Sequence, residues 1–238
     1  MQSKLAFIIG NSDGIGLALT KQLLLDEWQI IGFSKSASQV EDSMYRHVVV
    51  DVTSDDFTHQ FEKMLQVPPD VVVYCAGIGE EFNIGSIEFE QKVIQVNLIG
   101  AVKTIEAVLP VFIQKKNGQI IVISSLADQI ISSDAPSYSA SKAGLSNYVE
   151  GIALAARKYG VSITNVRFGF VDSKMSKSEK LPLMMTVEKS VEHLLKCIDK
   201  KPIRYSRPRI IAVIVLFIRW FIGLKLLFIR GISNRPDI

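Results

Sequence analysis

Short apolar runs alternate with longer amphipathic segments along most of the chain. The apolar runs predict strands, and the amphipathic segments predict helices. Val71–Val73 and Ile120–Ile123 are apolar at every position, which is typical of parallel strands covered on both faces. The predicted strands are Leu5–Ile9, Ile30–Phe33, His47–Val50, Val71–Cys75, Gln119–Ser124 and Ser162–Phe168, and the predicted helices are Ile15–Asp26, Asp55–Leu65, Phe89–Lys116 and Ser137–Tyr159.

This alternation predicts an α/β fold, a single doubly wound parallel sheet with helices on both faces. Neither a repeat nor a low-complexity linker occurs before residue 200, so we expect residues 1–200 to form one domain. Residues 201–238 are predicted to form a separate apolar, basic C-terminal helix, and no seventh strand is evident there.

Composition excludes several classes of protein. With 48% hydrophobic and 21% charged residues and a net charge of +3, the bulk of the chain is not disordered. Two cysteines cannot build a disulfide framework, and no Cys/His cluster has metal-ligand spacing. We therefore expect no metal site and a reducing, cytoplasmic location. Lys4 precedes an apolar run too short for a signal peptide.

The positive charge is concentrated at the C-terminal end. Residues 200–238 hold nine of the 27 Lys and Arg residues but only one of the 24 acidic residues. The preceding part of the chain is therefore acidic overall, which argues against nucleic-acid binding. The basic, apolar end requires a separate explanation.

A glycine-rich turn follows the first predicted strand. Gly10, Gly14 and Gly16 are spaced Gly-x3-Gly-x-Gly, and a predicted helix begins there. Glycines let the backbone turn sharply and approach a pyrophosphate, which the positive N-terminus of a helix stabilises. Glycines in an ordinary turn would give the same spacing, but the position directly after a strand favours dinucleotide binding.

Three side chains indicate acid–base chemistry. Tyr138 and Lys142 lie four residues apart on a predicted helix and so share one face. A lysine ammonium near a phenol favours the phenolate and lowers the phenol pKa. Ser125 follows a buried strand, and ligands of open α/β sheets bind beyond such strand ends. The alternatives are a solvated helix face for the pair and a capping role for Ser124 and Ser125.

In order and spacing, these motifs resemble those of the short-chain dehydrogenase/reductases over roughly residues 4–200. The motifs that carry the resemblance are Gly10-x3-Gly14-x-Gly16, Tyr74-Cys75-Ala76-Gly77, Asn97, Ile123-Ser124-Ser125 and Tyr138-x3-Lys142. The resemblance implies a Rossmann-fold oxidoreductase that transfers a hydride between a nicotinamide and a small-molecule carbonyl or alcohol. The alternative is a catalytically idle nucleotide sensor or scaffold on the same fold.

The resemblance also implies a role for each catalytic position. Tyr138 would be the general acid/base, and Ser125 would bind the substrate oxygen. Lys142 would bind the nicotinamide ribose and lower the pKa of Tyr138. Asn97 would hold a kinked helix and a proton-relay water.

The cofactor contacts are implied in the same way. Asp51 would meet the adenine, Val171 the carboxamide and Ser173 a phosphate. The predicted set is Gly10, Ser12, Asp13, Gly14, Ile15, Gly16, Ser34, Lys35, Asp51, Val52, Ala76, Gly77, Tyr138, Lys142, Val171 and Ser173. The chain departs from the family pattern at Phe168, usually proline, at Ser173, usually threonine, and at Tyr74-Cys75, usually Asn-Asn.

The choice of nicotinamide depends on charge after the second strand. NAD-binding proteins of this fold offer an acidic side chain there to the ribose hydroxyls. This chain has Ser34, Lys35 and Ser36 instead, which suit a 2′-phosphate. Asp13 argues the other way, because NADP-preferring relatives often carry a basic residue at that position. NADP(H) is the favoured cofactor.

The substrate is predicted to be lipophilic. The segment 174–185 contains Met175, Leu181, Leu183, Met184 and Met185, flexible apolar residues that suit a lipophilic substrate or a closing lid. Plain packing of a short helix is the alternative. Small residues along the predicted helices Phe89–Lys116 and Ser137–Tyr159 would allow close helix approach, so we expect a homodimer or homotetramer.

The C-terminal segment is predicted to associate with a membrane surface. Ile210–Ile229 contains fifteen Ile, Val, Leu or Phe residues, interrupted by Arg219 and Lys225. The apolar residues favour membrane insertion by about 4.5–9 kcal/mol and the two charges oppose it by about 5–7 kcal/mol, so spanning is near break-even. A helix in the interface with anionic headgroups, on the cytoplasmic membrane face, fits better. Docking against the body or a partner subunit is the alternative.

Overall fold

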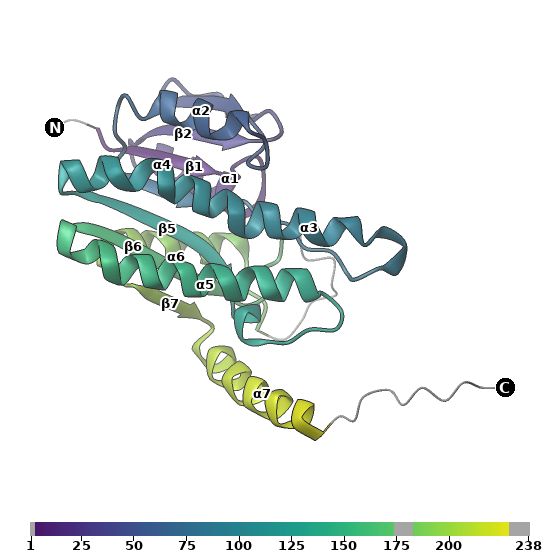
Figure 1. Ribbon diagram of the computed structural model, residues 1–238. Helices are drawn as coiled ribbons and strands as arrows, with labels where there is room; N and C mark the ends of the chain where they lie inside the picture. The colour runs from purple at the N-terminus through teal and green to yellow at the C-terminus, as the bar shows by residue number, and fades with distance from the viewer. Residues whose placement is uncertain (1–2, 174–182, 229–238) are drawn as a thin grey trace.

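The computed structural model describes residues 3–173 and 183–228, and it contains one seven-stranded parallel sheet (Figure 1). The strand order is β3-β2-β1-β4-β5-β6-β7. The strands are β1 (Leu5–Ile9), β2 (Gln29–Ser34), β3 (Tyr45–Val49), β4 (Val71–Tyr74), β5 (Gly118–Ser125), β6 (Val161–Phe168) and β7 (Arg204–Arg207). The predicted doubly wound sheet is confirmed.

Helices cover both faces of the sheet. The α-helices are α1 (Gly14–Leu25), α2 (Asp56–Met64), α3 (Glu88–Ile94), α4 (Gly100–Lys115), α5 (Pro136–Ala156), α6 (Val187–Lys200) and α7 (Arg209–Phe228). The short 3-10 helices are η1 (Ile84–Ser86), η3 (Leu126–Gln129) and η4 (Arg157–Tyr159). A single turn of π-helix, the π-turn η2 (Gln95–Ile99), joins α3 to α4. Helices α2, α4 and α5 pack on one face, and α1 and α6 pack on the other.

The two-sided core explains the continuous apolar runs. Successive side chains of a strand point to opposite faces. In β1, Phe7 and Ile9 belong to the core under α2, α4 and α5, whereas Ala6 and Ile8 belong to the core under α1 and α6. Each strand position must therefore be apolar, which removes the alternation of a half-exposed strand.

The predicted absence of a seventh strand is wrong. Arg204–Arg207 pairs in parallel with β6, and Phe168 aligns with Arg207. The strand is short, polar and half-exposed at the sheet edge, so it shows neither a continuous apolar run nor a clear alternation. The sheet thus extends past the boundary expected at residue 200, and α7 begins directly after it.

The segment predicted as one helix over Phe89–Lys116 contains a π-turn, Gln95–Ile99, between α3 and α4. The buried hydroxyl of Tyr74 donates a hydrogen bond to the Val96 carbonyl oxygen at 2.6 Å. A Cβ at Gly100 would collide with that hydroxyl, so glycine is required there. Tyr74, a departure from the family pattern, therefore supports the turn that carries Asn97.

Candidate active site

The four predicted catalytic residues lie near the carboxyl ends of β4 and β5. Ser125 ends β5, and Asn97 lies within the π-turn η2. Tyr138 and Lys142 lie in the first turns of α5, which begins with Pro136. Proline suits this position because the first helical residues have no N–H partner within the helix. The topology brings together positions that are far apart in the sequence.

Lys142 is almost entirely buried, with 4% of its surface exposed. Its Nζ donates to the Ile123 carbonyl oxygen at 3.0 Å and lies 5.8 Å from the centre of the Tyr138 ring. Burial penalises the charged ammonium and lowers the pKa of Lys142 to about 8. The side chain can therefore change charge in a range close to neutral pH.

The pKa of Tyr138 differs from the sequence-based expectation. Burial raises the pKa of Tyr138 above its usual value, and a hydrogen bond with Ser125 opposes that rise. The Lys142 ammonium lies 5.8 Å from the centre of the Tyr138 ring, and burial is the dominant influence on the Tyr138 pKa. Tyr138 is held as a neutral phenol, the form that can donate a proton.

Asn97 anchors the loop that follows β4. Its Oδ1 accepts from Ile78 N at 2.8 Å, while its Nδ2 donates to the Ile78 carbonyl oxygen at 2.9 Å and to Ser141 Oγ at 3.0 Å. Ser141 precedes Lys142 on α5. The amide thus ties the π-turn, the loop after β4 and α5 into one unit.

The glycine-rich turn forms a shallow cradle at the start of α1. Gly10 has a φ of +82°, and a Cβ there would lie 2.5 Å from the Ala76 nitrogen. At Gly16 a Cβ would collide with the Gly10 carbonyl oxygen. Gly14 has a φ of +51°, and a Cβ there would meet only the Ser173 Cβ, at the ordinary contact distance of 3.9 Å. The turn therefore packs tightly at Gly10 and Gly16 and less tightly at Gly14.

The remaining predicted cofactor residues follow the carboxyl ends of several strands. Ser12 and Ile15 are half-buried and Asp13 is exposed, while Ala76 and Gly77 follow β4 beside Gly10. Val171 bridges to Met185 before α6, which places Ser173 near Gly14. Val52 is buried beside Gly100. Met175 and Leu181 of the predicted substrate loop lie outside the described residues, and of the rest of that loop Met185 is buried whereas Leu183 is exposed.

The predicted 2′-phosphate region contains an ion pair. Lys35 Nζ lies 3.6 Å from Asp51 Oδ2, and Ser34 Oγ donates to the Ser36 carbonyl oxygen at 2.7 Å. Burial raises the pKa of Asp51, but hydrogen bonds from Thr53 and the charge of Lys35 outweigh this and hold it below its usual value. Asp51 is therefore an anion beside the predicted ribose site.

Comparison with known proteins assigns the family. Residues 4–182 match the short chain dehydrogenase family. The chain belongs to that family. An uncharacterised oxidoreductase of Myxococcus xanthus is 29% identical over 229 residues, which cover 90% of each protein. A short-chain dehydrogenase from Burkholderia cenocepacia in complex with NADP superposes with a TM-score of 0.83 at 19% identity, covering 96% of this chain and 99% of that one.

Another solved structure, 4-hydroxyisoleucine dehydrogenase complexed with NADH, superposes with a TM-score of 0.76 at 20% identity over 86% of this chain and 96% of that one. This short-chain dehydrogenase is thus an oxidoreductase acting on CH–OH and C=O groups, and its cofactor is a nicotinamide dinucleotide. The glycine-rich turn fits such a group, because Gly14 and Gly16 present no side chain at the N-terminus of α1, where backbone N–H groups favour a pyrophosphate.

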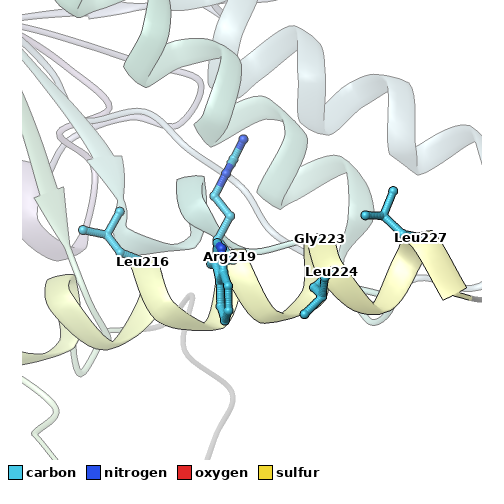
Figure 2. Close-up of a pocket in the computed structure, with 6 residues that line it drawn as sticks. Leu216, Arg219, Gly223, Leu224 and Leu227 are labelled. Carbon is cyan, nitrogen blue, oxygen red and sulfur yellow. The ribbon is translucent and has the colours of Figure 1, made fainter.

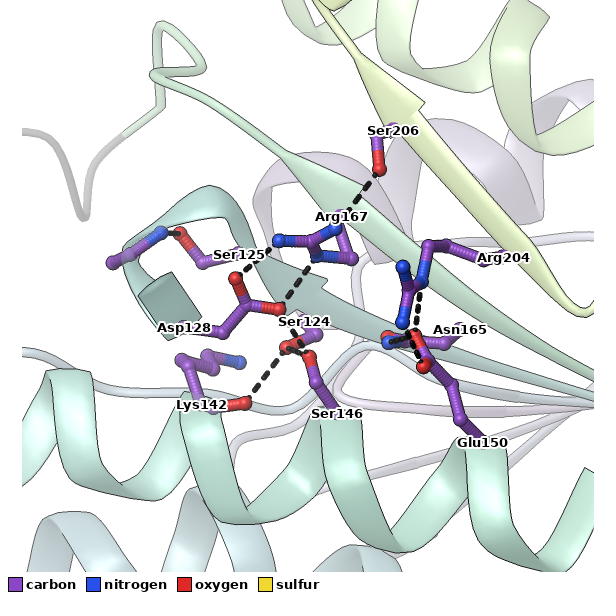
Figure 3. Close-up of polar contacts among 11 residues, drawn as sticks. Ser124, Ser125, Asp128, Lys142, Ser146, Glu150, Asn165, Arg167, Arg204 and Ser206 are labelled. Atoms are coloured by element: carbon purple, nitrogen blue, oxygen red, sulfur yellow. Dashed lines mark hydrogen bonds and ion pairs between the residues drawn. The ribbon is translucent and has the colours of Figure 1, made fainter. Parts of the chain in front are cut away.

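Sequence reasoning missed one buried ion pair. Asp128 on η3 and Arg167 on β6 have side chains that are 1% and 6% exposed (Figure 3). A signal was present, because Arg167 is the one charged residue of the strand Val161–Phe168, and a buried charge requires a partner. Among residues 3–173 and 183–228, no group of three or more His, Cys, Asp or Glu side chains is arranged to hold a metal ion.

Proposed function

We propose that this short-chain dehydrogenase uses NADP(H) to reduce the carbonyl group of a lipophilic compound, reversibly, at a membrane surface. The observation that carries the reaction is the set of side chains near the end of β5. Tyr138 is a half-buried neutral phenol that hydrogen-bonds with Ser125, and the buried Lys142 lies over its ring. A bound nicotinamide supplies the hydride for the carbonyl carbon.

In the proposed reaction, Ser125 orients the substrate oxygen with its hydroxyl, and Tyr138 donates its proton to that oxygen. The raised pKa of Tyr138 keeps this proton in place at neutral pH until the oxygen acquires negative charge. Lys142 binds the ribose and supplies positive charge that stabilises the resulting phenolate. Asn97 keeps the π-turn and α5 in register through Ser141.

The NADP(H) preference rests on the absence of an acidic residue in Ser34-Lys35-Ser36. Lys35 pairs with Asp51, but its side chain is 70% exposed. Exposed ion pairs are worth about 1 kcal/mol or less, so a 2′-phosphate with two negative charges competes well for the ammonium. Lys35 can exchange one partner for the other by rotating its flexible side chain.

The test is a charge reversal of Lys35. We expect Lys35→Glu to raise the KM for NADPH about tenfold while leaving the KM for NADH within about twofold. Lys21, on α1 and outside the predicted site, provides a control charge reversal, Lys21→Glu. Equal effects on both cofactors would contradict the proposed preference.

The lipophilic substrate is supported by exposed apolar side chains that follow the carboxyl ends of the central strands. Phe82 follows β4, Ile131 follows β5, and Phe170 follows β6, with exposures of 40%, 54% and 51%. The backbone of Phe82 donates to the Asp134 carbonyl oxygen at 2.7 Å, which joins the first two of these loops. Apolar groups at the rim of a site favour an apolar ligand.

The proposed preference for a lipophilic substrate can be tested by measuring NADPH oxidation with a panel of ketones, aldehydes, quinones and lipidic carbonyls. We expect kcat/KM to rise with chain length within a homologous series of ketones, by up to about fourfold per buried CH2 group. A preference for short, polar carbonyls would contradict it.

Membrane association is supported by α7. Two helices of the described residues are apolar and long enough to span a membrane by composition. Of these, Glu88–Lys115 is 44% buried within the protein, whereas Arg209–Leu227 is only 6% buried. Figure 2 shows Leu216, Arg219 and Leu227 projecting from one side of α7. A long Arg side chain can place its charge at headgroups while its methylenes remain in an apolar layer.

Liposome flotation tests the association. We expect full-length protein to float with vesicles of anionic phospholipid, and a chain ending at Arg207 to stay at the bottom. A variant with Arg219→Gln and Lys225→Gln keeps the apolar surface and should bind more weakly to anionic vesicles. A full-length protein that stays at the bottom while the shortened chain unfolds would overturn this part, because α7 would then be a structural helix.

We also propose that the protein forms a homodimer or homotetramer. Along α5, Ala140, Gly151 and Leu154 are exposed, and nothing lies within 4 Å of a Cβ at Gly151. Small exposed residues allow a second helix to approach closely. Light scattering should give at least twice the mass of one chain, and a monomer at all concentrations would contradict this expectation.

A further inference from the structure

Asp128 and Arg167 form a fork-shaped ion pair inside the protein. Arg167 Nε donates to Asp128 Oδ2 at 2.6 Å, and Nη2 donates to Oδ1 at 2.5 Å (Figure 3). The side chains are 6% and 1% exposed. Removing two charges from water is costly, and apolar residues of similar volume are often equally stable. Stability alone therefore does not account for a charged pair at this place.

The carboxylate of Asp128 also accepts a hydrogen bond from the first of two linked serine hydroxyls. Ser146 Oγ lies 2.6 Å from Asp128 Oδ2, and Ser124 Oγ lies 2.9 Å from Ser146 Oγ. A carboxylate only accepts, so Ser146 donates its one proton to Asp128 and accepts from Ser124. The Ser124 hydroxyl shares its proton between Ser146 and the Lys142 carbonyl oxygen, which lies 3.3 Å away. Both hydrogen bonds form only when β5 and α5 are correctly aligned.

This arrangement links β5, α5 and β6, three of the segments that carry the proposed site. Ser124 precedes Ser125 at the end of β5, and Ser146 lies one turn after Lys142 on α5. Arg167 lies near the end of β6, from which the chain leads to Val171 and Ser173. Asp128 itself follows Ser125 on η3. One carboxylate therefore contacts β5 through Ser146, and α5 and β6 directly.

We propose that Asp128 is a positioning residue that sets the distance between Ser125 on β5 and the Tyr138–Lys142 pair on α5, relative to the cofactor loop after β6. The inference rests on the proposed catalytic roles of these residues. Hydrogen bonds and ion pairs require particular distances and angles, whereas apolar packing permits small shifts between elements. Shifts of about 1 Å in a site can cost about 100-fold in rate.

Glu150, one helical turn further along α5, provides a control. Glu150 accepts from both Asn165 Nδ2 on β6 and the guanidinium of Arg204 on β7 (Figure 3). It lies four residues after Ser146 on the same helix and forms the same kind of forked pair. Its hydrogen-bond partners Asn165 and Arg204 lie on β6 and β7, and the Arg204 side chain is more exposed than that of Arg167. Glu150→Gln therefore weakens a forked pair on the same helix and removes no hydrogen bond of the Ser124–Ser146–Asp128 network.

The experiment compares Ser146→Ala and Asp128→Asn with Glu150→Gln in the full-length protein. The measurements are kcat and KM for NADPH, the melting temperature, and the Tyr138 pKa from NMR titration of 13C-labelled tyrosine, with Tyr138→Phe to assign the signal. Ser146→Ala leaves the buried ion pair intact, so it decides the question if Asp128→Asn does not fold.

We expect Ser146→Ala to lower kcat about tenfold, with the KM for NADPH within about twofold. The Tyr138 pKa should rise by about half a unit, because Ser125 withdraws from the phenol and the hydrogen bond that lowers this pKa is weakened. Glu150→Gln should match the parent in both measurements.

If Ser146→Ala melts earlier but keeps the kcat and the Tyr138 pKa of Glu150→Gln, the network is structural and the inference is wrong. The titration needs no substrate. A parent protein without carbonyl reductase activity would therefore refute the proposed function, while the titration would still decide whether Asp128 positions the site.

Discussion

Two neighbouring regions of the protein reverse the usual placement of charge and apolar surface. Around η3, a carboxylate and a guanidinium are buried, with Asp128 only 1% exposed. Along α7, which begins beside η3, apolar side chains are exposed, among them Trp220 at 68% and Leu227 at 78%. Pro208, just before α7, and Ile211 in its first turn pack near Gly169.

The difference lies in where each region finds its partners. The buried charges are satisfied within the chain, because Arg167 and Asp128 neutralise each other and Ser146 completes the network. The apolar surface of α7 is not covered in this way, and Val215 is its one deeply buried apolar residue among those described. A large exposed apolar surface is typical of proteins that bind a partner or a membrane.

The largest expected contrast between the two regions comes from removing one side chain from each. We expect Arg167→Ala to lower the free energy of unfolding by about 3–5 kcal/mol, because Asp128 is left buried without its partner. Trp220→Ala on α7 should change the free energy of unfolding by less than about 0.5 kcal/mol. Urea unfolding of both variants without lipid measures the contrast, and equal losses would show that α7 is part of the folded core.

Tyr138→Phe separates the chemistry of the site from the surface of α7. Removing the hydroxyl should lower turnover at least about 100-fold, because the substrate oxygen loses its proton donor. Binding of NADPH, measured by fluorescence, and flotation with anionic liposomes should both match the parent. A variant as fast as the parent would refute the assignment of Tyr138.

The smallest expected effect concerns the pH dependence of Lys142. Its buried ammonium donates to a carbonyl rather than a carboxylate, and burial lowers its pKa to about 8. The positive charge is present below this pH and lost above it, so kcat for carbonyl reduction should fall above about pH 8. Lys142→Arg remains charged because the guanidinium pKa exceeds about 12. We expect this variant to be less active and its kcat not to fall above about pH 8. A fall that is unchanged in Lys142→Arg would assign the titration to another group.

Sequence patterns predicted most of the sheet and failed at particular elements. The six apolar strands were confirmed, because both faces of each central strand must be apolar. Helix α6 (Val187–Lys200) was not predicted, although it is strongly amphipathic and Thr186 caps its start by accepting from Lys189 N at 3.2 Å. Strand β7 was missed because edge strands need little apolar surface.

The fold class, the family and the predicted Ser125, Tyr138 and Lys142 set could be inferred from the amino-acid sequence, since these depend on residue types at short, regular spacings. How these groups are tuned depends on the tertiary structure. The pKa of Tyr138 depends on burial and on Ser125, and the pairing of Asp128 with Arg167 joins residues 39 positions apart. Burial and long-range contacts are properties of the packed chain, and local spacing does not encode them.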